Sequence, residues 1–278
     1  MAYIREVLQA AVVQRYTLER QIGRGGWAVV YLARRTDSGE PAAVKVLRPE
    51  FARFVGAERF HREIALLGGL RHPNILPLLE SGQAGALPYY VMPYADGQSL
   101  RERLEREAQL SLAEVVRIVR PIVAALDYAH ARNIVHRDIK PDNVLFLSGT
   151  PMVADFGIAR AIVQAGGDDL SSSGLIPGTP EYMSPEQASG EHQLDGRSDL
   201  YSLGCMTYEM LAGQPPFTGS SVQAIVARHA HAPPPPVRVV RPDVSEHVER
   251  AIAAALAKRA QDRPASGAAL LASLAGGS

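Results

Sequence analysis

The spacing of apolar residues changes near residue 95, and this change limits the fold more than any other feature of the sequence. Before that point the apolar residues form short runs separated by Gly and Asp, which is typical of strands and turns. From about residue 111 they recur every three or four positions, which is typical of helices. A chain of 278 residues also exceeds the usual size of a single core. The sequence therefore predicts an α+β fold, either as one large domain or as two lobes, with a β-rich part over residues 16–95 and a helical part over residues 96–275.

The first lobe is expected to hold an antiparallel sheet of five strands and one main helix. The expected strands are Tyr16–Ile22, Val29–Ala33, Ala42–Leu47, Ile75–Leu79 and Tyr89–Tyr94. We expect a turn at Gly82 and Gly85 and a helix over Gly56–Leu67. Residues 1–15 form a leader that is expected to fold as a short helix packed on the domain. Its apolar residues at helical spacing are Ile4, Val7, Leu8, Ala11 and Val12.

The second lobe begins with a long helix. Ser111 and Glu114 have the spacing of a capping box, in which each side chain satisfies a backbone amide of the other residue. The stretch Gly166–Gly178 predicts an exposed loop, the charged run Arg101–Glu107 a solvated helix face, and residues 276–278 the start of a linker. Further helices are expected over Leu200–Leu211, Ser221–Ala230, Ser245–Ala257 and Ala265–Leu274, and short strands over Val144–Leu147 and Met152–Ala154.

The charge balance argues against two classes of partner. The chain has 29 basic and 29 acidic residues, so it carries no overall charge that would attract nucleic acid or an anionic membrane. No charge-free apolar run approaches the roughly 18 residues that a membrane span needs. Cys205 is the single cysteine, so no internal disulfide is possible, and we expect a small buried hydrophobe there. These features predict a chain that resides in the reducing cytoplasm and makes no membrane contact of its own.

A glycine-rich turn connects the first two expected strands. The sequence from Ile22 to Val30 matches most of the pattern G-x-G-x-x-G-x-V, with Ala28 at the third glycine. Because the turn lies between two strands, it lacks the helix N-terminus that binds phosphate in a dinucleotide site or a Walker loop. Glycine lets backbone amides approach phosphates that a side chain would obstruct. The glycines concerned are Gly23, Gly25 and Gly26, and Trp27 beside them would either shield the phosphates or stiffen the loop.

Lys45 lies within an apolar strand, where an unpaired ammonium group is costly, so it needs a partner. Glu63 is the candidate because it lies on the helix that follows. An ordinary salt bridge is the simpler interpretation of such a pair. Only three of the 29 basic residues are lysines, so the sequence strongly favours arginine. A lysine that remains despite this preference suggests a site that needs a compact positive charge. This argument singles out Lys45 and Lys140.

The most specific signal is a series of short motifs in a fixed order. His136-Arg-Asp-Ile-Lys-Pro-Asp-Asn143 is followed by Asp155-Phe-Gly157, then by Gly178-Thr-Pro-Glu-Tyr182 and Ser184-Pro-Glu186. This order and spacing resembles that of the eukaryotic-type (Hanks-type) protein kinases, and more narrowly that of the bacterial Ser/Thr kinases. The resemblance covers residues 16–274 and implies the two-lobed protein-kinase fold. It also makes Asp199 a landmark at a helix start and pairs Arg263 with Glu186.

The resemblance assigns a chemical role to each of the main candidates. Lys45, held by Glu63, would bind the α- and β-phosphates of ATP. Lys140 would neutralise the γ-phosphate, and Asp138 would accept the proton of the substrate hydroxyl. These roles make the chain a protein Ser/Thr kinase that acts on protein substrates.

The resemblance also implies which residues hold ATP and its metal. Asn143 and Asp155 would bind Mg²⁺, with Mn²⁺ as a substitute, because such hard cations suit carboxylate and amide oxygens. Met92 falls at the gatekeeper position, Pro93 would offer its carbonyl to adenine, and Ala95 would offer its amide. The full set expected to contact ATP between the lobes is Ile22, Gly23, Gly25, Gly26, Val30, Ala43, Lys45, Met92, Pro93, Ala95, Asn143, Leu145 and Asp155.

Regulation is expected in the activation segment, residues 155–186. Arg137 resembles the arginine that pairs with a phosphorylated residue of this segment in many family members. A phosphate adds a charge of about −1.5 to −2, which is enough to order a loop against an arginine. We therefore expect the chain to phosphorylate a second copy of itself in trans, with a homodimer as one way for the copies to meet. The candidate phosphosites are Ser171, Ser172, Ser173 and Thr179.

Other interpretations stay open at this stage. A pseudokinase scaffold is disfavoured because all the catalytic groups are present, and a small-molecule kinase because Gly178–Glu186 resembles a protein-substrate platform. Pro233–Pro236 is either a polyproline ligand for an SH3-like partner or a stiff connector between two helices. His229 and His231 form H-x-H, but no carboxylate or cysteine lies near them in sequence, which disfavours a metal site. Bacterial relatives are often the cytoplasmic domain of a single-pass receptor, and this chain is either such a domain or a separate kinase.

Overall fold

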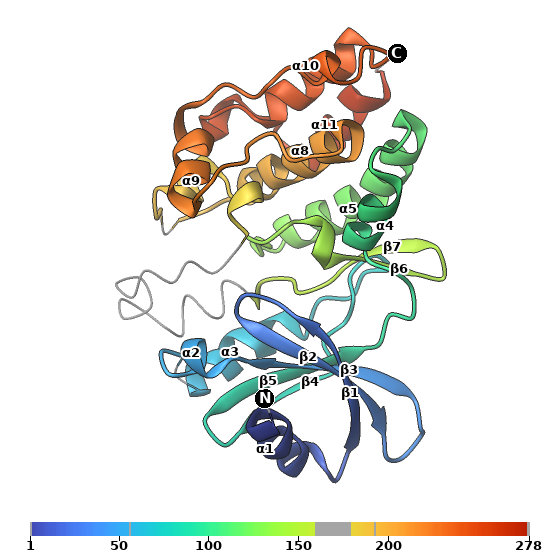
Figure 1. Ribbon diagram of the computed structural model, residues 1–278, viewed down its shortest axis with the longest axis vertical. Helices are drawn as coiled ribbons and strands as arrows, with labels where there is room; N and C mark the ends of the chain where they lie inside the picture. Colours follow the sequence, from blue (N-terminus) through green and yellow to red (C-terminus); the bar gives the residue numbers. More distant parts are fainter. Residues whose placement is uncertain (1, 56, 159–178, 192, 277–278) are drawn as a thin grey trace. The chain divides into compact units, whose positions relative to one another are not determined.

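The computed structural model forms two compact units (Figure 1). It describes residues 2–55, 57–158, 179–191 and 193–276. Unit 1 comprises residues 1–71, 76–96 and 157–177, and unit 2 comprises residues 72–75, 97–156 and 178–278. The main division follows Asp96, one residue beyond the expected boundary. Residues 72–75 group with unit 2 because the Asn74 carbonyl accepts a hydrogen bond from Val153 N–H at 2.8 Å and Ile75 forms a bridge with the same valine.

Unit 1 is built on one antiparallel sheet of five strands in the order β1-β2-β3-β5-β4. The strands are β1 (Tyr16–Arg24), β2 (Ala28–Arg35), β3 (Pro41–Leu47), β4 (Glu80–Ala84) and β5 (Leu87–Pro93). This confirms the five-stranded sheet that the sequence predicts. In β5 six of the seven residues are buried, because this strand lies between β3 and β4 and is covered on both faces.

The fourth strand lies later in the chain than expected. The prediction of a strand over Ile75–Leu79 is wrong, since β4 begins one residue after this run. Pro77 interrupts the run and cannot donate to a ladder, so Ile75 and Leu76 are buried there without forming a strand, and Leu79 is 43% exposed. Gly82 is a strand residue opposite Tyr89, whose ring fills the space that a side chain at position 82 would need. Gly85, with φ of 58°, makes the turn.

The helices of unit 1 are α1 (Ala2–Val12), α2 (Pro49–Ala52) and α3 (Ala57–Leu67). α3 matches the main helix expected from the sequence and packs against β4. α2 is a single turn with a proline at its start, which the sequence analysis did not predict. Phe60 and Ile64 of α3 have no exposed surface, as the spacing of four residues predicts for one face of a helix.

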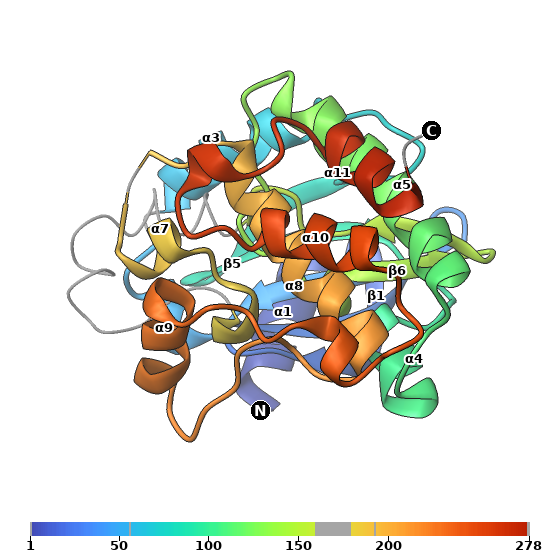
Figure 2. The same ribbon diagram turned by 90° about the horizontal axis from the view of Figure 1, so that it is seen from above.

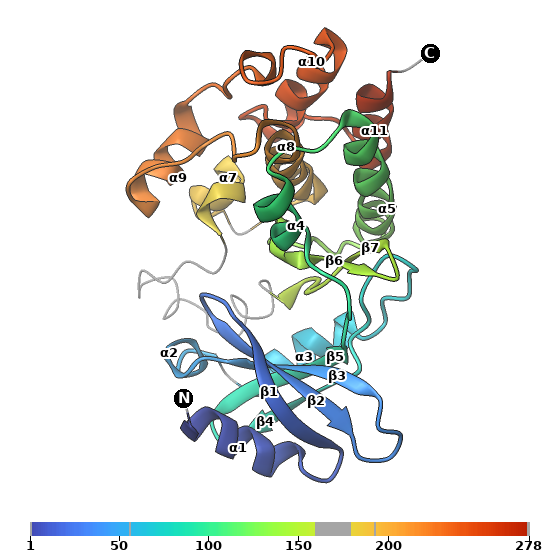
Figure 3. The ribbon, with the colours of Figure 1, turned by 45° about the vertical axis from the view of Figure 1, so that its right-hand side comes forward.

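α1 packs against β1 and β4 of the same unit (Figure 3). Leu8 and Val12 have no exposed surface. Gln9 binds β1 with both ends of its side chain: Nε2 donates to the Tyr16 carbonyl at 3.1 Å, and Oε1 accepts from Leu18 N–H at 2.7 Å. The first helix is therefore an integral part of unit 1.

Unit 2 is mainly helical and is arranged around α8 (Gly196–Ala212), every residue of which is buried from Ser198 onward. α5 and α10 pack against α8, and α11 lies beside α5 (Figure 2). Burial raises the pKa of the Cys205 thiol on α8, which agrees with the expected inert hydrophobe. The remaining helices and strands are α4 (Leu100–Glu107), α5 (Leu112–His130), β6 (Val144–Leu147), β7 (Thr150–Val153), α7 (Pro185–Ala188), α9 (Val222–His231), α10 (Glu246–Ala255) and α11 (Gly267–Ala275).

Among its described residues, unit 2 also contains four single turns of 3₁₀ helix, namely η1 (Pro141–Asn143), η2 (Pro180–Tyr182), η3 (Val237–Val239) and η4 (Ala260–Asp262). The run Pro233–Pro236 links α9 to η3. Within the described ranges, none of the helices is at once long enough and apolar enough to cross a bilayer.

Two local expectations need correction. Ser111 caps α5, but the Glu114 carboxylate accepts from the Ser111 hydroxyl at 3.1 Å and pairs with Arg103, so the box is only half formed. The solvated face expected over Arg101–Glu107 is also wrong in part. Arg103 is 8% exposed because Glu107 and Glu114 both hold it, and Arg101 donates to the buried Glu209 at 2.7 Å.

Leu8→Ala should destabilise the protein by about 2–5 kcal/mol, because it empties a fully buried position between α1 and the sheet. Tyr3 lies on the same helix and is 63% exposed, so Tyr3→Ala is a matched control with an expected effect within about 0.5 kcal/mol. Urea unfolding measures both variants. Equal stability of Leu8→Ala and the parent would contradict the role of α1 in unit 1.

Candidate active site

The predicted site residues divide between the two units, and each group is described within its own unit. Unit 1 holds Ile22, Gly23, Gly25, Gly26, Val30, Ala43, Lys45, Glu63, Met92, Pro93 and Ala95. Unit 2 holds Asp138, Lys140, Asn143, Leu145, Asp155 and Thr179. The candidate phosphosites Ser171, Ser172 and Ser173 lie outside the described residues, as does the expected loop Gly166–Gly178.

The glycine-rich turn is a hairpin loop between β1 and β2. Gly25 N–H donates to the Ala28 carbonyl at 2.9 Å, and Arg48 Nη1 donates to the Gly26 carbonyl at 2.8 Å. Neither Gly25 nor Gly26 has a positive φ. A Cβ added at Gly26 would meet nothing within 4 Å, and one at Gly25 would meet only the Ala28 carbonyl at 3.9 Å. The fold itself therefore does not require glycine at these two positions, and contact of Gly25 and Gly26 with ATP stays a prediction.

Lys45 lies on β3, in register with Val30 of β2 and Tyr90 of β5. Its Nζ is 4.4 Å from the centroid of the Trp27 ring, which is a cation–π contact. Trp27 is buried and therefore links the glycine-rich loop to this lysine. Glu63 is half-buried on α3, and its pairing with Lys45 stays a prediction.

Ala43, Met92 and Pro93 lie at the end of the sheet where β3 begins and β5 ends. Ala43 on β3 is opposite Met92 on β5, and both side chains are buried. The sheet ends at Pro93, and Ala95 follows in irregular structure. The pairing of β3 with β5 thus places Ala43 next to the segment that carries Met92, Pro93 and Ala95, which are also expected to contact ATP.

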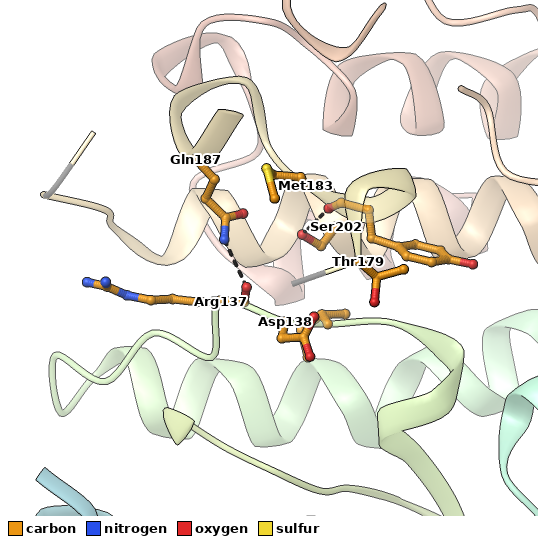
Figure 4. Close-up of a pocket in the computed structure, with 8 residues that line it drawn as sticks. Arg137, Asp138, Thr179, Met183, Gln187 and Ser202 are labelled. Carbon is orange, nitrogen blue, oxygen red and sulfur yellow. Dashed lines mark hydrogen bonds between the residues drawn. The ribbon is translucent and has the colours of Figure 1, made fainter. Parts of the chain in front are cut away.

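Asp138 lines a small pocket of unit 2 together with Thr179 (Figure 4), and two further predicted residues contact its carboxylate. Lys140 Nζ lies 2.8 Å from Asp138 Oδ2, and Asn143 Nδ2 donates to the same oxygen at 3.0 Å. Lys140 also donates to Thr179 Oγ1 at 2.6 Å, and Asn143 Nδ2 to the Asp138 carbonyl at 2.7 Å. Both side-chain donors converge on Oδ2. Among the described residues Oδ1 therefore accepts no hydrogen bond, and it is available to a ligand hydroxyl.

His136 supports Asp138 in one defined tautomer. Asp138 N–H donates to His136 Nδ1 at 3.2 Å, so Nδ1 must be the acceptor nitrogen. Nε2 then carries the hydrogen and donates to the Ala154 carbonyl at 2.9 Å. The Phe156 ring packs edge-on against the imidazole, with 4.6 Å between centroids. His136 has no exposed surface, so it ties Asp138 to the chain before Asp155 and cannot reach a substrate.

Asp199, on α8, fixes the backbone of the same loop. Its carboxylate accepts from His136 N–H and Arg137 N–H, both at 2.8 Å, and contacts His130 Nε2 at 2.7 Å. Burial alone would raise the pKa of Asp199, but the hydrogen bonds from His130 and His136 lower it below its usual value. Burial opposes protonation of His130, yet the bond to Asp199 raises its pKa. The sequence marks Asp199 only as a landmark at a helix start. A carboxylate at the start of an apolar helix is a usable signal, because a buried carboxylate must accept hydrogen bonds from nearby donors.

Arg137 has a φ of 71°, a conformation that costs a residue with a side chain about 1–3 kcal/mol. Its N–H is held by Asp199, and its carbonyl accepts from Gln187 Nε2 at 2.8 Å (Figure 4). These two bonds hold the strained residue from opposite sides. The direction of the next residue, Asp138, is thereby fixed.

The segment around η2 is anchored to α8. Ser202 Oγ donates to the Tyr182 carbonyl at 2.7 Å (Figure 4), and Tyr182 Oη donates to Glu209 Oε2 at 2.5 Å. Burial and the neighbouring carboxylate raise the pKa of Tyr182, so its hydroxyl stays a donor. Arg101 from α4 completes the cluster by donating to Glu209 and Tyr182. Sequence analysis missed this cluster because its members come from three separate segments.

Glu186 and Arg263 form the ion pair that the sequence predicts. The guanidinium donates to both carboxylate oxygens, at 2.6 and 2.7 Å, and Ser198 Oγ donates to one of them at 2.6 Å. Burial would raise the pKa of Glu186, but the hydrogen bonds from Arg263 and Ser198 hold it below its usual value. The same guanidinium also donates to the carbonyls of Ala257, Lys258 and Arg197.

The oxygens of unit 2 suit a magnesium ion. Asn143 uses its Nδ2 for Asp138, so its Oδ1 accepts no hydrogen bond from the described residues. Asp155 follows β7 by two residues and has a φ of 62°. One amide oxygen and one carboxylate are ligands that suit Mg²⁺, so Asn143 and Asp155 would hold such an ion together with oxygens of a bound nucleotide and water. Residues 2–55, 57–158, 179–191 and 193–276 contain no group of three or more His, Cys, Asp or Glu that would hold a metal alone.

Comparison with known proteins places this geometry in a family. Residues 16–273 match the model of the protein kinase domain. A probable serine/threonine-protein kinase PknB of Bifidobacterium longum is 41% identical over 260 residues, which cover 90% of this chain and 37% of that protein. Serine/threonine-protein kinase PknB of Mycobacterium tuberculosis is 38% identical over 255 residues, covering 90% of this chain and 40% of that protein. The chain thus spans about two fifths of the length of these curated relatives.

The solved structures agree with the sequence relatives. The crystal structure of a mutant of the Mycobacterium tuberculosis PknI kinase domain matches with a TM-score of 0.74 and 30% identity, over 94% of each chain. The chain therefore belongs to the protein kinase domain family. Within this family it is a catalytic domain of the bacterial Ser/Thr kinase type, with the α+β fold that the sequence predicts.

Arg263→Ala should lower the free energy of unfolding by about 3–5 kcal/mol, because it leaves the largely buried Glu186 carboxylate without its partner. Arg259→Ala is the matched control, since Arg259 is 70% exposed and lies 3.7 Å from Asp262. Because the pKa of Glu186 is lowered in the folded state, the pair stabilises the protein above the usual glutamate pKa and loses this effect as the pH falls through the folded value. Urea unfolding at neutral and acid pH should show the two variants converging in acid. A difference that grows in acid would contradict this role.

Proposed function

We propose that this chain is a protein Ser/Thr kinase domain that transfers the γ-phosphoryl group of ATP to hydroxyl groups of proteins, with Mg²⁺ or Mn²⁺ as the metal. The arrangement of Asp138 carries the proposal. Its Oδ2 accepts from Lys140 and Asn143, while its Oδ1 accepts nothing among the described residues. Phosphoryl transfer asks a protein mainly for positioning and charge neutralisation, and this arrangement supplies both.

Three residues of the loop divide the work. Asp138 orients the substrate hydroxyl and takes its proton at Oδ1 as the oxygen–phosphorus bond forms and the bond between the γ-phosphorus and the leaving ADP breaks. Asn143 holds the carboxylate against rotation through its two bonds to Asp138. Lys140 bridges Asp138 and Thr179, and its ammonium group offsets the charge of the transferred group.

The nucleotide-binding roles are assigned within each unit. In unit 1, Lys45 binds phosphate with Glu63 as its partner, and the loop with Gly25 and Gly26 offers backbone amides at positions where no side chain obstructs them. Pro93 and Ala95 bind adenine beside the gatekeeper Met92, and Ile22, Gly23, Val30 and Ala43 also contact the nucleotide. In unit 2, Leu145 contacts the nucleotide, and Asn143 and Asp155 hold the metal ion. When bound, this ion neutralises phosphate charge.

Two alternative functions have less support. A pseudokinase scaffold does not account for an Asp138 whose two donors leave one oxygen available. A small-molecule kinase does not account for the segment after Thr179, which Ser202 and Tyr182 anchor to α8 and Lys140 ties to Asp138. An anchored segment beside the base suits an extended polypeptide substrate.

Asp138→Asn should lower the transfer rate by about 10²- to 10⁴-fold and leave ATP binding nearly intact, because a base is lost and no nucleotide contact is. Lys45→Met should weaken both. Asp142→Asn, on the adjacent η1, is the matched control because that carboxylate is exposed and pairs only weakly with Arg101 at 3.5 Å. Radiolabelled ATP with myelin basic protein as acceptor measures the rate, and titration calorimetry measures ATP binding.

The same assay tests the metal. EDTA should abolish transfer, and Mg²⁺ or Mn²⁺ should restore it better than Ca²⁺, which prefers a looser shell of oxygens. Equal rates in EDTA and Mg²⁺ would refute the metal role. More than a tenth of the parent rate in Asp138→Asn would refute the role of Asp138.

We also propose that the chain phosphorylates a second copy of itself in the activation segment. Asp199 and Gln187 fix the backbone of Arg137 through hydrogen bonds. The guanidinium that would bind the phosphate is therefore attached to a fixed backbone position. Thr179 is already held by Lys140, which favours Ser171–Ser173 as the sites. After incubation with Mg-ATP, mass spectrometry should find phosphate there, and replacing all three serines by alanine should lower activity, whereas the exposed-loop control Ser148→Ala should not. Full activity of the triple variant, with no phosphate in the segment, would exclude this switch.

The location of the kinase is part of the same proposal. We place it in the cytoplasm, as the cytoplasmic domain of a single-pass receptor or as a separate kinase. The sequence of the whole gene product decides between these two.

A further inference from the structure

His229, on α9, is a fully buried histidine that the proposed chemistry does not use. Its imidazole packs against two aromatic rings, with 4.8 Å between its centroid and that of Phe217 and 5.6 Å to that of Tyr201. Its Nδ1 lies 2.9 Å from Tyr201 Oη. The helix that carries it packs against both α7 and η2.

The surroundings of His229 define its protonation state. Burial lowers the pKa of the imidazole to about 4, and the positive charge of Lys258 adds to the effect. The ring is therefore neutral at physiological pH and carries one hydrogen. Burial also raises the pKa of Tyr201, so its hydroxyl remains a donor and can supply the hydrogen bond to Nδ1. The imidazole hydrogen is then on Nε2.

The Nε2 atom of His229 is buried and makes no hydrogen bond within the described part of the chain. The backbone of Glu181 and Pro180 in η2 lies close enough to the imidazole to oppose the lowering of its pKa, yet no bond from Nε2 meets the distance and angle of a hydrogen bond. Proline has no N–H, so the polar backbone atom that Pro180 presents must be its carbonyl oxygen. A buried N–H group without an acceptor destabilises the structure, because it has lost its hydrogen bonds to water. Forming a hydrogen bond to a nearby carbonyl removes this cost.

The backbone of His229 is held as firmly as its ring. Lys258 Nζ donates to the His229 carbonyl at 2.7 Å and to the Arg228 carbonyl at 3.3 Å, both in the last turn of α9. A cation at this end of a helix is stabilised by the helix dipole and by the unsatisfied carbonyls. The same ammonium group lies 4.3 Å from the Phe217 ring centroid. His229 therefore has little freedom to move, and closing its Nε2 bond requires a shift of η2.

We propose that His229 is a positioning residue for the protein substrate, which closes a hydrogen bond from Nε2–H to the Pro180–Glu181 backbone when the acceptor segment is occupied. This inference rests on the proposed function. The proposal rests on a series of contacts that connects η2 to the base. η2 comes directly after Thr179, and Lys140 contacts both Thr179 and Asp138. α8 holds the far end of η2 through Tyr182, so His229 acts on the end nearer Thr179.

The test compares three variants on the whole chain. His229→Leu removes both ring nitrogens at similar volume, His229→Gln keeps a donor that can reach η2, and His231→Leu is the matched control because His231 is exposed two residues further along α9. His229→Leu should raise the KM for myelin basic protein by roughly 3- to 10-fold, as expected for one lost hydrogen bond, with the KM for ATP unchanged. His229→Gln should recover part of this loss, and His231→Leu should match the parent.

Hydrogen exchange provides a readout that does not depend on activity. With myelin basic protein bound, the amides of residues 179–183 should exchange more slowly in the parent, and His229→Leu should lose this protection while the amides of 136–143 stay the same. A KM for protein substrate that is unchanged in folded His229→Leu, or a fall in thermal stability with both KM values raised equally, would overturn the proposal. A parent chain that binds myelin basic protein but transfers no phosphate would instead refute the proposed function, while the exchange data still judge His229.

Discussion

Two backbone amides and one imidazole converge on the buried carboxylate of Asp199, and the geometry of the catalytic loop depends on this convergence. Without it, the amides of His136 and Arg137 would be buried without acceptors, at about 1–3 kcal/mol for each group. The bond to Arg137 also stabilises a left-handed backbone that this residue would otherwise avoid. Asp138 comes next in the chain, so the direction of the proposed base follows from a carboxylate that lies 61 residues further along.

One core helix holds both sides of the proposed chemistry. α8 supplies Asp199 to the catalytic loop, and Ser202 and Glu209 to the segment around η2. A helix of fixed rise therefore sets the spacing between base and acceptor segment. Buried ionic clusters of this kind are weak contributors to net stability, because desolvation offsets the Coulomb attraction. These clusters instead fix geometry, because each cluster holds the segments that carry its members in one relative position.

The three lysines illustrate how composition and structure combine. Arginine predominates among the basic residues, and each lysine that remains occupies a site where a compact ammonium group makes close contacts. Lys45 lies under the Trp27 ring, and Lys140 bridges Asp138 and Thr179. Lys258, which the sequence argument passed over, caps the last turn of α9. The rarity of lysine was therefore informative at all three positions, but only the structure shows what Lys258 contacts.

The sequence by itself determined the elements and groups whose causes are local. Asp138, Lys140 and Asn143 lie within six residues of one loop, so their spacing already brought the catalytic groups together. Short apolar runs between turns gave four of the five strands of unit 1, and helical periodicity gave the main helices, because steric and hydrogen-bonding preferences act over a few residues. Where a local cue was ambiguous, as at Pro77 in the expected fourth strand, the prediction failed.

Tertiary structure alone decided which distant groups share a buried site. Arg101 and Glu209 are 108 residues apart, and nothing in the periodicity of either helix indicates that they meet. The same holds for His229, whose H-x-H pattern indicated no partner and whose neighbours are a tyrosine, a phenylalanine and the backbone of η2. The physical reason is that the partner of a buried polar group is chosen by the packing of whole helices around a dry core, where each donor and acceptor must be satisfied at once.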